Sequence, residues 1–398
     1  MVAMQDTLQH TLQDFIRRIL HASQTGQPLR LRGGGTKDFL GQVLQGEVLD
    51  TRAYSGILSY EPSELVITVR AGTPLAEVEA ALAEKGQSFA FEPPHFSAGR
   101  LDALGEGATI GGMVAAGLAG PSRASVGTVR DFVLGARVIN GKGEHLTFGG
   151  QVMKNVAGYD VSRLLAGSWG QLGLITEVSL KVLPVAPGEA TLVCAGVSQA
   201  QALKLINQWG GQPLPLNASA WVYDTTANPA QDFFFVRLRG AVAAVDAAVT
   251  KMSADVQALG AQVTRMNPQD VADDWHASGE QTLDFFKAQS EHACLWRLSV
   301  PQTAPVLDVR VNGEACAQYI EWHGAQRWLW APASAASQVR EAAVKAGGHA
   351  TLFRTSSAHG DADKQVGVYT PLNDVQQRIQ NELKKQFDPA GIFNPGRV

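Results

Sequence analysis

The sequence predicts an α+β protein in which a ligand-binding part is followed by a separate α/β part. Three observations support this fold class. Residues 105–175 are rich in glycine, yet the glycines alternate with small and β-branched residues, as in backbone that lies close to a large ligand. From about residue 189 the predicted elements follow the order β-α-β-β-α-β, the ferredoxin-like unit. Seven of the eight tryptophans lie after Pro187, where glycine becomes less frequent.

The composition is that of a globular protein. The chain has 398 residues, 45% of them hydrophobic and 18% charged, so we expect two or three domains. The net charge of −4 argues against nucleic acid as a partner. We expect no transmembrane segment and no signal peptide, because the apolar run at 108–121 is short and the first residues lack a basic region. Three distant cysteines (Cys194, Cys294 and Cys316) encode neither a disulfide framework nor an iron–sulfur site, which fits the cytoplasm.

The first 185 residues are predicted to contain two helices and several short strands. Apolar residues at helical spacing predict a helix over about residues 5–22. Thr73-Pro74 predicts the start of a second helix, which Gly86 ends. The turn at 140–143 predicts a hairpin between strands 129–139 and 144–148. Further strands are predicted at 29–32, 48–50, 55–60, 64–70 and 174–182.

The second part begins with the ferredoxin-like unit. Its predicted elements are strand 190–196, helix 198–209, strands 219–223 and 233–239, helix 241–259 and strand 262–265. Then follow a helix at 268–290, strands at 294–300, 318–322 and 327–331, a helix at 335–346 and a strand at 349–354. Thr370-Pro371 would begin a last helix. Two interpretations of Trp296, Trp322, Trp328 and Trp330 stay open, because tryptophan suits both the core of a small sheet and a partner surface.

The first strand runs into Gly33-Gly34-Gly35-Thr36-Lys37, whose consecutive amides could bind an anion. Two common nucleotide-binding templates fail here. No GxxxxGK[ST] string occurs, and Asp38 stands where GxGxxG needs its third glycine, so neither a P-loop ATPase nor a classical Rossmann enzyme is predicted. A plain turn is an equal alternative for this run.

Two later segments are also rich in glycine. Residues 107–117 suit backbone that lies against a phosphate before it enters a short helix, and the alternative is a tightly packed helix pair. Residues 154–176 contain Tyr159, Asp160 and Arg163, followed by glycines around Trp169. Asp160 and Arg163 taken alone would be a surface ion pair. The ordered recurrence of three such segments favours one large bound ligand.

Together these segments resemble the flavoproteins of the vanillyl-alcohol-oxidase type, which carry a PCMH-type FAD-binding domain. The matching strings are R-G-G-G-T-K, A-T-I-G-G-M-V-A, residues 127–135, G-Y-D, G-S-W-G-Q-L-G-L-I-T and the terminal F-D-P-A-G-I-F-N-P-G-R. More narrowly, the chain is similar over most of its length to the FAD-binding E subunits of bacterial glycolate oxidase (glycolate dehydrogenase), including G-G-H-A-T-L-F-R at 347–354. The resemblance implies a two-subdomain FAD-binding domain at 1–185 (about 1–53 and 54–185), a ferredoxin-like cap at 186–365, and a helix and tail at 366–398 that return to the FAD domain.

The resemblance also implies which residues bind FAD. The first loop would be Gly33, Gly34, Gly35, Thr36 and Lys37, and the second Gly107, Ala108, Thr109, Gly111 and Gly112. Backbone at Gly117 and Gly127 would pass along the cofactor. Gly170, Gly173 and Ile175 would lie by the adenosine half, and Asn394 by the isoalloxazine edge. Covalent members attach the flavin through His or Cys, whereas Thr36 and Lys37 stand at the usual place here, so non-covalent FAD is expected.

The implied function is that of the FAD-binding subunit of a glycolate-oxidising complex. Its partners would be an FAD-containing catalytic subunit and an iron–sulfur subunit, in the cytoplasm or peripherally at the inner membrane through the complex. The metal and substrate string G-H-x-G-D-G-N-x-H of related dehydrogenases is missing, since 348–354 holds one His and no acidic neighbour, so no metal site and no catalytic residue is assigned. One alternative is a stand-alone FAD-dependent 2-hydroxy-acid oxidase in which Arg354, Tyr159 or Lys154 binds a carboxylate. The other is a non-catalytic assembly subunit.

Overall fold

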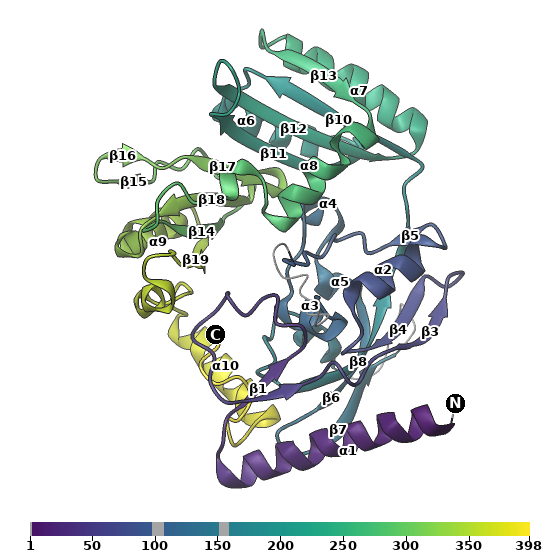
Figure 1. The fold of residues 1–398 in the computed structure, drawn as a ribbon. Helices are drawn as coiled ribbons and strands as arrows, with labels where there is room; N and C mark the ends of the chain where they lie inside the picture. The colour runs from purple at the N-terminus through teal and green to yellow at the C-terminus, as the bar shows by residue number, and fades with distance from the viewer. Residues whose placement is uncertain (1, 98–106, 151–158) are drawn as a thin grey trace. The chain divides into compact units, whose positions relative to one another are not determined.

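The computed structural model describes residues 2–97, 107–150 and 159–398, which form two compact units (Figure 1). The first unit contains Met1–Ala119, Thr128–Val185 and Pro371–Val398, and the second contains Gly120–Gly127 and Ala186–Thr370. The chain therefore enters the second unit twice, first for a short excursion directly after the glycine-rich helix α3 (Ile110–Ala116) and then for its long middle part.

The main sheet of the first unit has five antiparallel strands in the order β3-β4-β8-β6-β7. Their bounds are Ile57–Glu61, Val66–Arg70, Leu174–Lys181, Val133–Ile139 and His145–Gly149. The hairpin of β6 and β7 was predicted from its turn and is confirmed. Helix α2 (Leu75–Ala83) buries Leu75, Val78 and Leu82, and the strands β5 (Gln87–Ser88) and β9 (Leu183–Pro184) pair nearby. This sheet carries α3 and the loop before β8.

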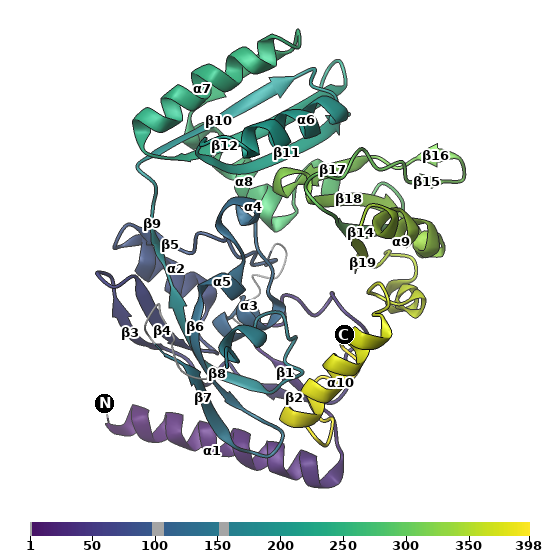
Figure 2. The same cartoon turned by 180° about the vertical axis from the view of Figure 1, so that it is seen from behind.

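A small parallel pair, β1 (Leu29–Arg32) and β2 (Glu47–Asp50), forms the other part of the first unit. Helix α1 (Val2–Thr25) lies near β7 of the first unit in both views (Figures 1 and 2). Its Phe15 and Ile19 are buried against residues of both sheets. Phe393, near the C-terminus, belongs to the same core and forms a parallel β-bridge with Leu29. This core therefore holds the last residues of the chain beside β1.

The second unit is built on eight antiparallel strands in the order β13-β10-β12-β11-β17-β18-β14-β19. The first four strands, with α6 and α7, have the predicted ferredoxin-like order. The bounds are β10 Gly188–Ala195, α6 Gln199–Gly210, β11 Leu216–Asp224, β12 Gln231–Gly240, α7 Val242–Gln257 and β13 Gln262–Met266. The other half comprises β14 Cys294–Ser299, β17 Gln318–Glu321, β18 Gln326–Ala331, α9 Ala336–Lys345 and β19 His349–Arg354. The pairing of β17 with β11 joins the halves into one sheet.

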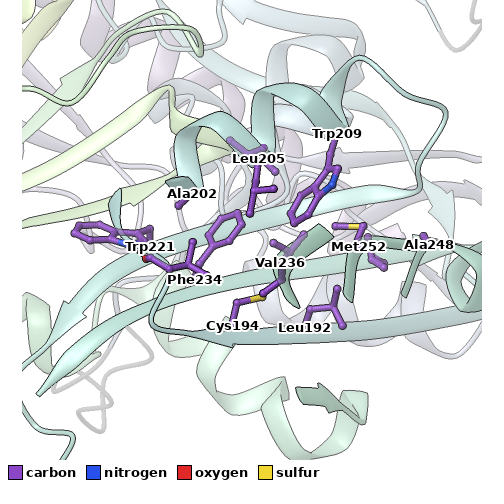
Figure 3. Packing of buried hydrophobic residues seen from close by; sticks show 14 of the residues in the cluster. Leu192, Cys194, Ala202, Leu205, Trp209, Trp221, Phe234, Val236, Ala248 and Met252 are labelled. Carbon is purple, nitrogen blue, oxygen red and sulfur yellow. Dashed lines mark hydrogen bonds between the residues drawn. The ribbon is translucent and has the colours of Figure 1, made fainter. Parts of the chain in front are cut away.

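Helices α6 and α7 cover one face of the ferredoxin-like half. Figure 3 shows Trp209 and Leu205 of α6 and Met252 of α7 around Phe234 and Val236 of β12. In the other half, the tryptophans that had two interpretations turn out to belong mainly to the core, since Trp296, Trp322 and Trp328 are buried and Trp330 is half-buried. Their indole N–H groups donate to oxygens within the unit.

Three predicted elements are wrong in part. Residues predicted to begin the strand at 129 form the short helix α5 (Val129–Phe132), because Thr128 and Asp131 make a capping box. Helix α8 (Pro268–Glu280) ends ten residues earlier than predicted, where Gln281 takes a left-handed conformation. Helix α10 (Asp374–Phe387) begins after Asn373, whose side chain accepts from the Gln376 amide at 2.9 Å.

No helix within the described residues is both long enough and apolar enough to cross a lipid bilayer.

Candidate functional site

Three segments of the first unit, distant in sequence, line one cavity of about 110 Å³. Residues 31–38 comprise the end of β1 and the loop after it, residues 108–116 contain α3, and residues 169–175 lead into the start of β8. Asn394 and Arg397 of the C-terminal tail complete the lining, together with Leu44, Thr51 and Ala71. The cavity is thus formed by the segments in which the sequence predicted a ligand.

The structure brings most of the predicted cofactor-binding residues together. The lining includes Gly33, Gly34, Gly35, Thr36, Lys37, Ala108, Thr109, Gly111, Gly112, Gly170, Gly173, Ile175 and Asn394. Gly107, Gly117 and Gly127 are not among the lining residues. Gly117 ends α3 with a positive φ of 65°, and a Cβ there would lie 2.8 Å from Gly167 Cα, so this glycine serves helix–loop packing. Gly127 ends α4 (Arg123–Val126) in the second unit.

Two glycines of the lining are required by close approach of backbone. A Cβ on Gly33 would lie 2.1 Å from Thr109 Oγ1, far inside van der Waals contact. A Cβ on Gly111 would lie 2.7 Å from the Cβ of Ala71, while the Gly111 amide donates to the Ala71 carbonyl at 2.8 Å. The first loop is therefore packed directly on the N-cap of α3, where Thr109 Oγ1 accepts from the Gly112 amide at 3.3 Å.

The first loop offers backbone donors to the cavity. Within the described residues, the amide N–H groups of Gly33, Gly34 and Thr36 donate to no protein acceptor. Buried backbone donors are almost always paired, so a ligand or water is expected at these groups. Successive amides in a glycine-rich turn are a common anion-binding arrangement.

Charged side chains add a positive field around this loop. Arg32, Lys37 and Arg397 line the cavity, and Asp38 is the acidic side chain of the lining. Asp38 is shared between two arginines, since Arg32 Nε lies 2.8 Å from its Oδ2 and Arg30 also pairs with it. Lys37 is buried, and its Nζ donates to Thr36 Oγ1 at 3.3 Å and to the His95 carbonyl at 3.4 Å. Among the described residues of the lining, cations therefore outnumber anions, which suits an anionic ligand.

Sequence reasoning missed several lining residues. Arg32 and Trp169 stand inside the strings that carried the family resemblance, so those strings contained the signal. Arg397 follows Asn394 in the terminal string and could have been found in the same way. Leu44, Thr51 and Ala71 lie in ordinary turns and strand ends, and only the fold brings them to the cavity.

Two of the three residues proposed for a carboxylate substrate, Tyr159 and Arg354, lie in the described part of the chain, one in each unit. Tyr159 is 93% exposed, and Arg163 Nη1 lies 3.3 Å from Asp160 Oδ2 as a surface ion pair. Lys154 lies outside the described residues. Arg354, in the second unit, lies 5.8 Å from the ring centre of Phe353, and burial lowers its pKa to about 10. In the described parts of the chain, no three His, Cys, Asp or Glu side chains are grouped to hold a metal ion.

Comparisons with known proteins agree with this geometry. Residues 8–149 match the family model described as FAD binding domain. The chain is 43% identical to glycolate oxidase subunit GlcE of Escherichia coli (strain K12), over 97% of each protein. It is 26% identical to glycolate oxidase subunit GlcD of Bacillus subtilis (strain 168), over 97% of this chain and 87% of that protein. A solved structure of alkyldihydroxyacetonephosphate synthase superposes with a TM-score of 0.67 at 15% identity, over 96% of this chain and 75% of that one, and so shares the fold.

Proposed function

The chain belongs to the family of the glycolate oxidase subunit GlcE, and on this premise we propose that it is the FAD-binding subunit of a complex that oxidises glycolate to glyoxylate. An FAD-containing catalytic subunit of the D type takes the hydride from C2 of glycolate. FAD bound to this chain would supply an electron carrier between that subunit and an iron–sulfur subunit. The match to GlcE over 97% of the chain and the match to the family model described as FAD binding domain support this assignment.

The single observation that carries the proposal is the cavity in the first unit. Among the described residues, the amides of Gly33, Gly34 and Thr36 donate to no protein acceptor, Gly33 packs closely on Thr109, and cationic side chains are in surplus around the cavity. These features fit the diphosphate of FAD. We assign the first loop and residues 108–112 to the diphosphate, and residues 170–175 to the adenosine half. Bound FAD supplies the capacity to accept and release two electrons, while the protein holds and orients it.

We propose that FAD is bound without a covalent link. In this class of flavoprotein, a covalent bond between the flavin and the protein is formed through a histidine or cysteine beside the flavin. Among the described residues that line the cavity, none is histidine or cysteine. Thr36 and Lys37, which follow the first-loop glycines, offer a hydroxyl and an amine instead, and both are buried.

The cysteines of this chain support an electron-relay role in which another subunit carries the iron–sulfur cluster. Its three cysteines are too few for a four-cysteine cluster, and Cys194 and Cys294 are buried in the core of the second unit. We therefore assign the iron–sulfur carrier to a partner subunit. The first unit, including its C-terminal segment, is proposed as the FAD-binding domain, with the cap at about 186–365. We place the protein in the cytoplasm, attached peripherally to the inner membrane through its complex.

The visible spectrum of the purified chain tests this function. We expect a flavin spectrum, release of the flavin into the supernatant on acid precipitation, and no bleaching when glycolate is added anaerobically. Bleaching by glycolate would instead identify a stand-alone 2-hydroxy-acid oxidase. Absence of flavin, together with failure of the protein to bind added FAD, would identify an assembly subunit and contradict the proposal.

A further inference from the structure

The penultimate residue of the chain is buried against the first glycine loop. The Nη1 atom of Arg397 donates to the Gln42 carbonyl at 2.9 Å, and its Nη2 donates to the carbonyls of Lys37 and Asp38 at 3.0 and 3.2 Å. Arg397 is only 4% exposed, and its guanidinium lies 5.3 Å from the ring centre of Trp169. One buried cation thus holds two of the segments that line the cavity.

These contacts determine which backbone groups of the loop remain for a ligand. A carbonyl oxygen carries partial negative charge, so a loop that turned its carbonyls towards the cavity would repel an anion. Arg397 takes up the carbonyls of Lys37 and Asp38, while the amides of Gly33, Gly34 and Thr36 keep no protein acceptor among the described residues. The loop can therefore present these amides to an anion while the carbonyls of Lys37 and Asp38 stay paired.

The backbone amide of Arg397 fixes the tail in turn. It donates to the Asn394 carbonyl at 3.2 Å, and the Gln42 amide donates back to the Arg397 carbonyl at 3.2 Å. Arg397 is therefore bound to residues 37–42 through both its main chain and its side chain. The anchored tail therefore holds the guanidinium in one position, unlike the guanidinium of a flexible arginine on the surface.

We propose that Arg397 is the positioning residue for the diphosphate of the cofactor, since it orders the first glycine loop in its anion-binding conformation. This role rests on the proposed function, because it assumes that FAD occupies the cavity. A planar guanidinium can donate to several carbonyls at once. A lysine ammonium in its place cannot reproduce this planar arrangement of N–H donors. The proposal thus distinguishes Arg397 from a residue that adds only positive charge.

The test measures the binding of FAD, ADP and riboflavin to apo protein, because riboflavin lacks the diphosphate that FAD and ADP contain. We expect Arg397→Ala to weaken FAD and ADP by about 10- to 100-fold, the range for loss of hydrogen bonds to a charged group, and to leave riboflavin within twofold. Arg397→Lys should keep the charge and still lose most of this affinity. Arg378→Ala removes an exposed arginine from the same C-terminal segment and should change none of the three.

Each other outcome has a defined meaning. Equal FAD binding by the wild type and by Arg397→Ala would overturn the role of Arg397 and leave the proposed function intact. A parallel loss of FAD, ADP and riboflavin would show that Arg397 acts on the whole fold, which also overturns it. If Arg397→Ala does not fold, full FAD affinity in Arg397→Lys would overturn the geometric argument. A wild type that binds no FAD would overturn the proposed function together with this role.

Discussion

The side-chain amide of Asn394 donates to the main-chain carbonyl of Trp169 at 2.6 Å, and its Oδ1 accepts from the Leu31 amide at 2.9 Å. The Asn394 carbonyl also accepts from Gln171 Nε2 at 3.3 Å. One residue near the C-terminus therefore ties strand β1 to the loop at 169–173, on two sides of the cavity. A direct contact between Asn394 and the isoalloxazine edge stays a prediction.

Asn394→Asp should separate these two segments. The substitution keeps the shape and replaces the donor to Trp169 by a carboxylate oxygen, so two negative oxygens face each other. Loss of a buried hydrogen bond with an unpaired group left behind costs about 1–3 kcal/mol, and we expect the free energy of unfolding to fall by that amount. Urea unfolding of the apo protein measures it. The control is Asn381→Asp on the exposed face of α10, which should stay within about 0.5 kcal/mol of the wild type. Equal stability of the two variants would contradict this assignment.

Gly33→Ala should weaken FAD binding. The new Cβ would lie 2.1 Å from Thr109 Oγ1, so the first loop or the start of α3 must move. Fluorescence titration with FAD is the measurement, and we expect a loss of at least about tenfold in affinity, which corresponds to about 1.4 kcal/mol.

A double-mutant cycle identifies the contact that causes the loss. Thr109→Ala removes the oxygen that the new Cβ would strike, so the double variant should regain part of the affinity that Gly33→Ala loses. Gly107→Ala is the matched control, because a Cβ at Gly107 meets no atom of the described residues within 4 Å. A strong effect at Gly107, or losses at Gly33 and Thr109 that simply add, would argue against the packing described here.

The sequence predicted the elements and the cofactor loops because both depend on local signals. The ferredoxin-like order came from hydrophobic periodicity, and the loops came from glycine strings. Gly107, Gly117 and Gly127 were assigned to the cofactor but are not among the lining residues. For Gly117 the reason is tertiary packing, because this glycine lies directly against Gly167. Ala71 could not have been found from sequence, because it faces Gly111 only after β4 and α3 pack together. The early end of α8 was missed because its left-handed residue is Gln281, whereas the nearby Gly279 lies inside the last turn of the helix.

Glu321 should make the protein less stable as the pH rises towards neutrality. Burial raises the pKa of this carboxyl to about 7, although Trp328 and Gln326 donate to it and Arg297 lies nearby. A folded-state pKa above the unfolded value of about 4.5 means that the native state holds a proton which the unfolded state has released. Stability is therefore lost as the pH rises from about 4.5 to 7, by up to about 3 kcal/mol.

Glu321→Gln tests this dependence, because glutamine keeps an oxygen that accepts from Trp328 and carries no charge. We expect the variant to be more stable than the wild type by about 1–3 kcal/mol at pH 8, and nearly equal to it at pH 4.5. Urea unfolding at the two pH values gives both differences. A constant difference between the proteins across this range would show that Glu321 does not titrate as described.

His323 should act in the opposite direction. Its Nε2 lies 2.9 Å from Ser125 Oγ and its Nδ1 lies 3.0 Å from Ser219 Oγ, all within the second unit. Burial lowers the pKa of this imidazole to about 4. The unfolded state, with a pKa near 6.5, therefore binds a proton first, and stability is lost as the pH falls from about 6.5 to 4.

His323→Asn separates this titration from the loss of the two hydrogen bonds. Asparagine tolerates the left-handed conformation of residue 323, where φ is 55°, so the backbone should be kept. At pH 7.5 the variant should be less stable than the wild type, since it cannot reach both serines. That deficit should shrink by up to about 3 kcal/mol between pH 7.5 and 4.5, because only the wild type then loses stability to histidine protonation. His276→Asn on the exposed face of α8 should show no such convergence, and a deficit that stays constant with pH would mean that His323 is not the group that titrates.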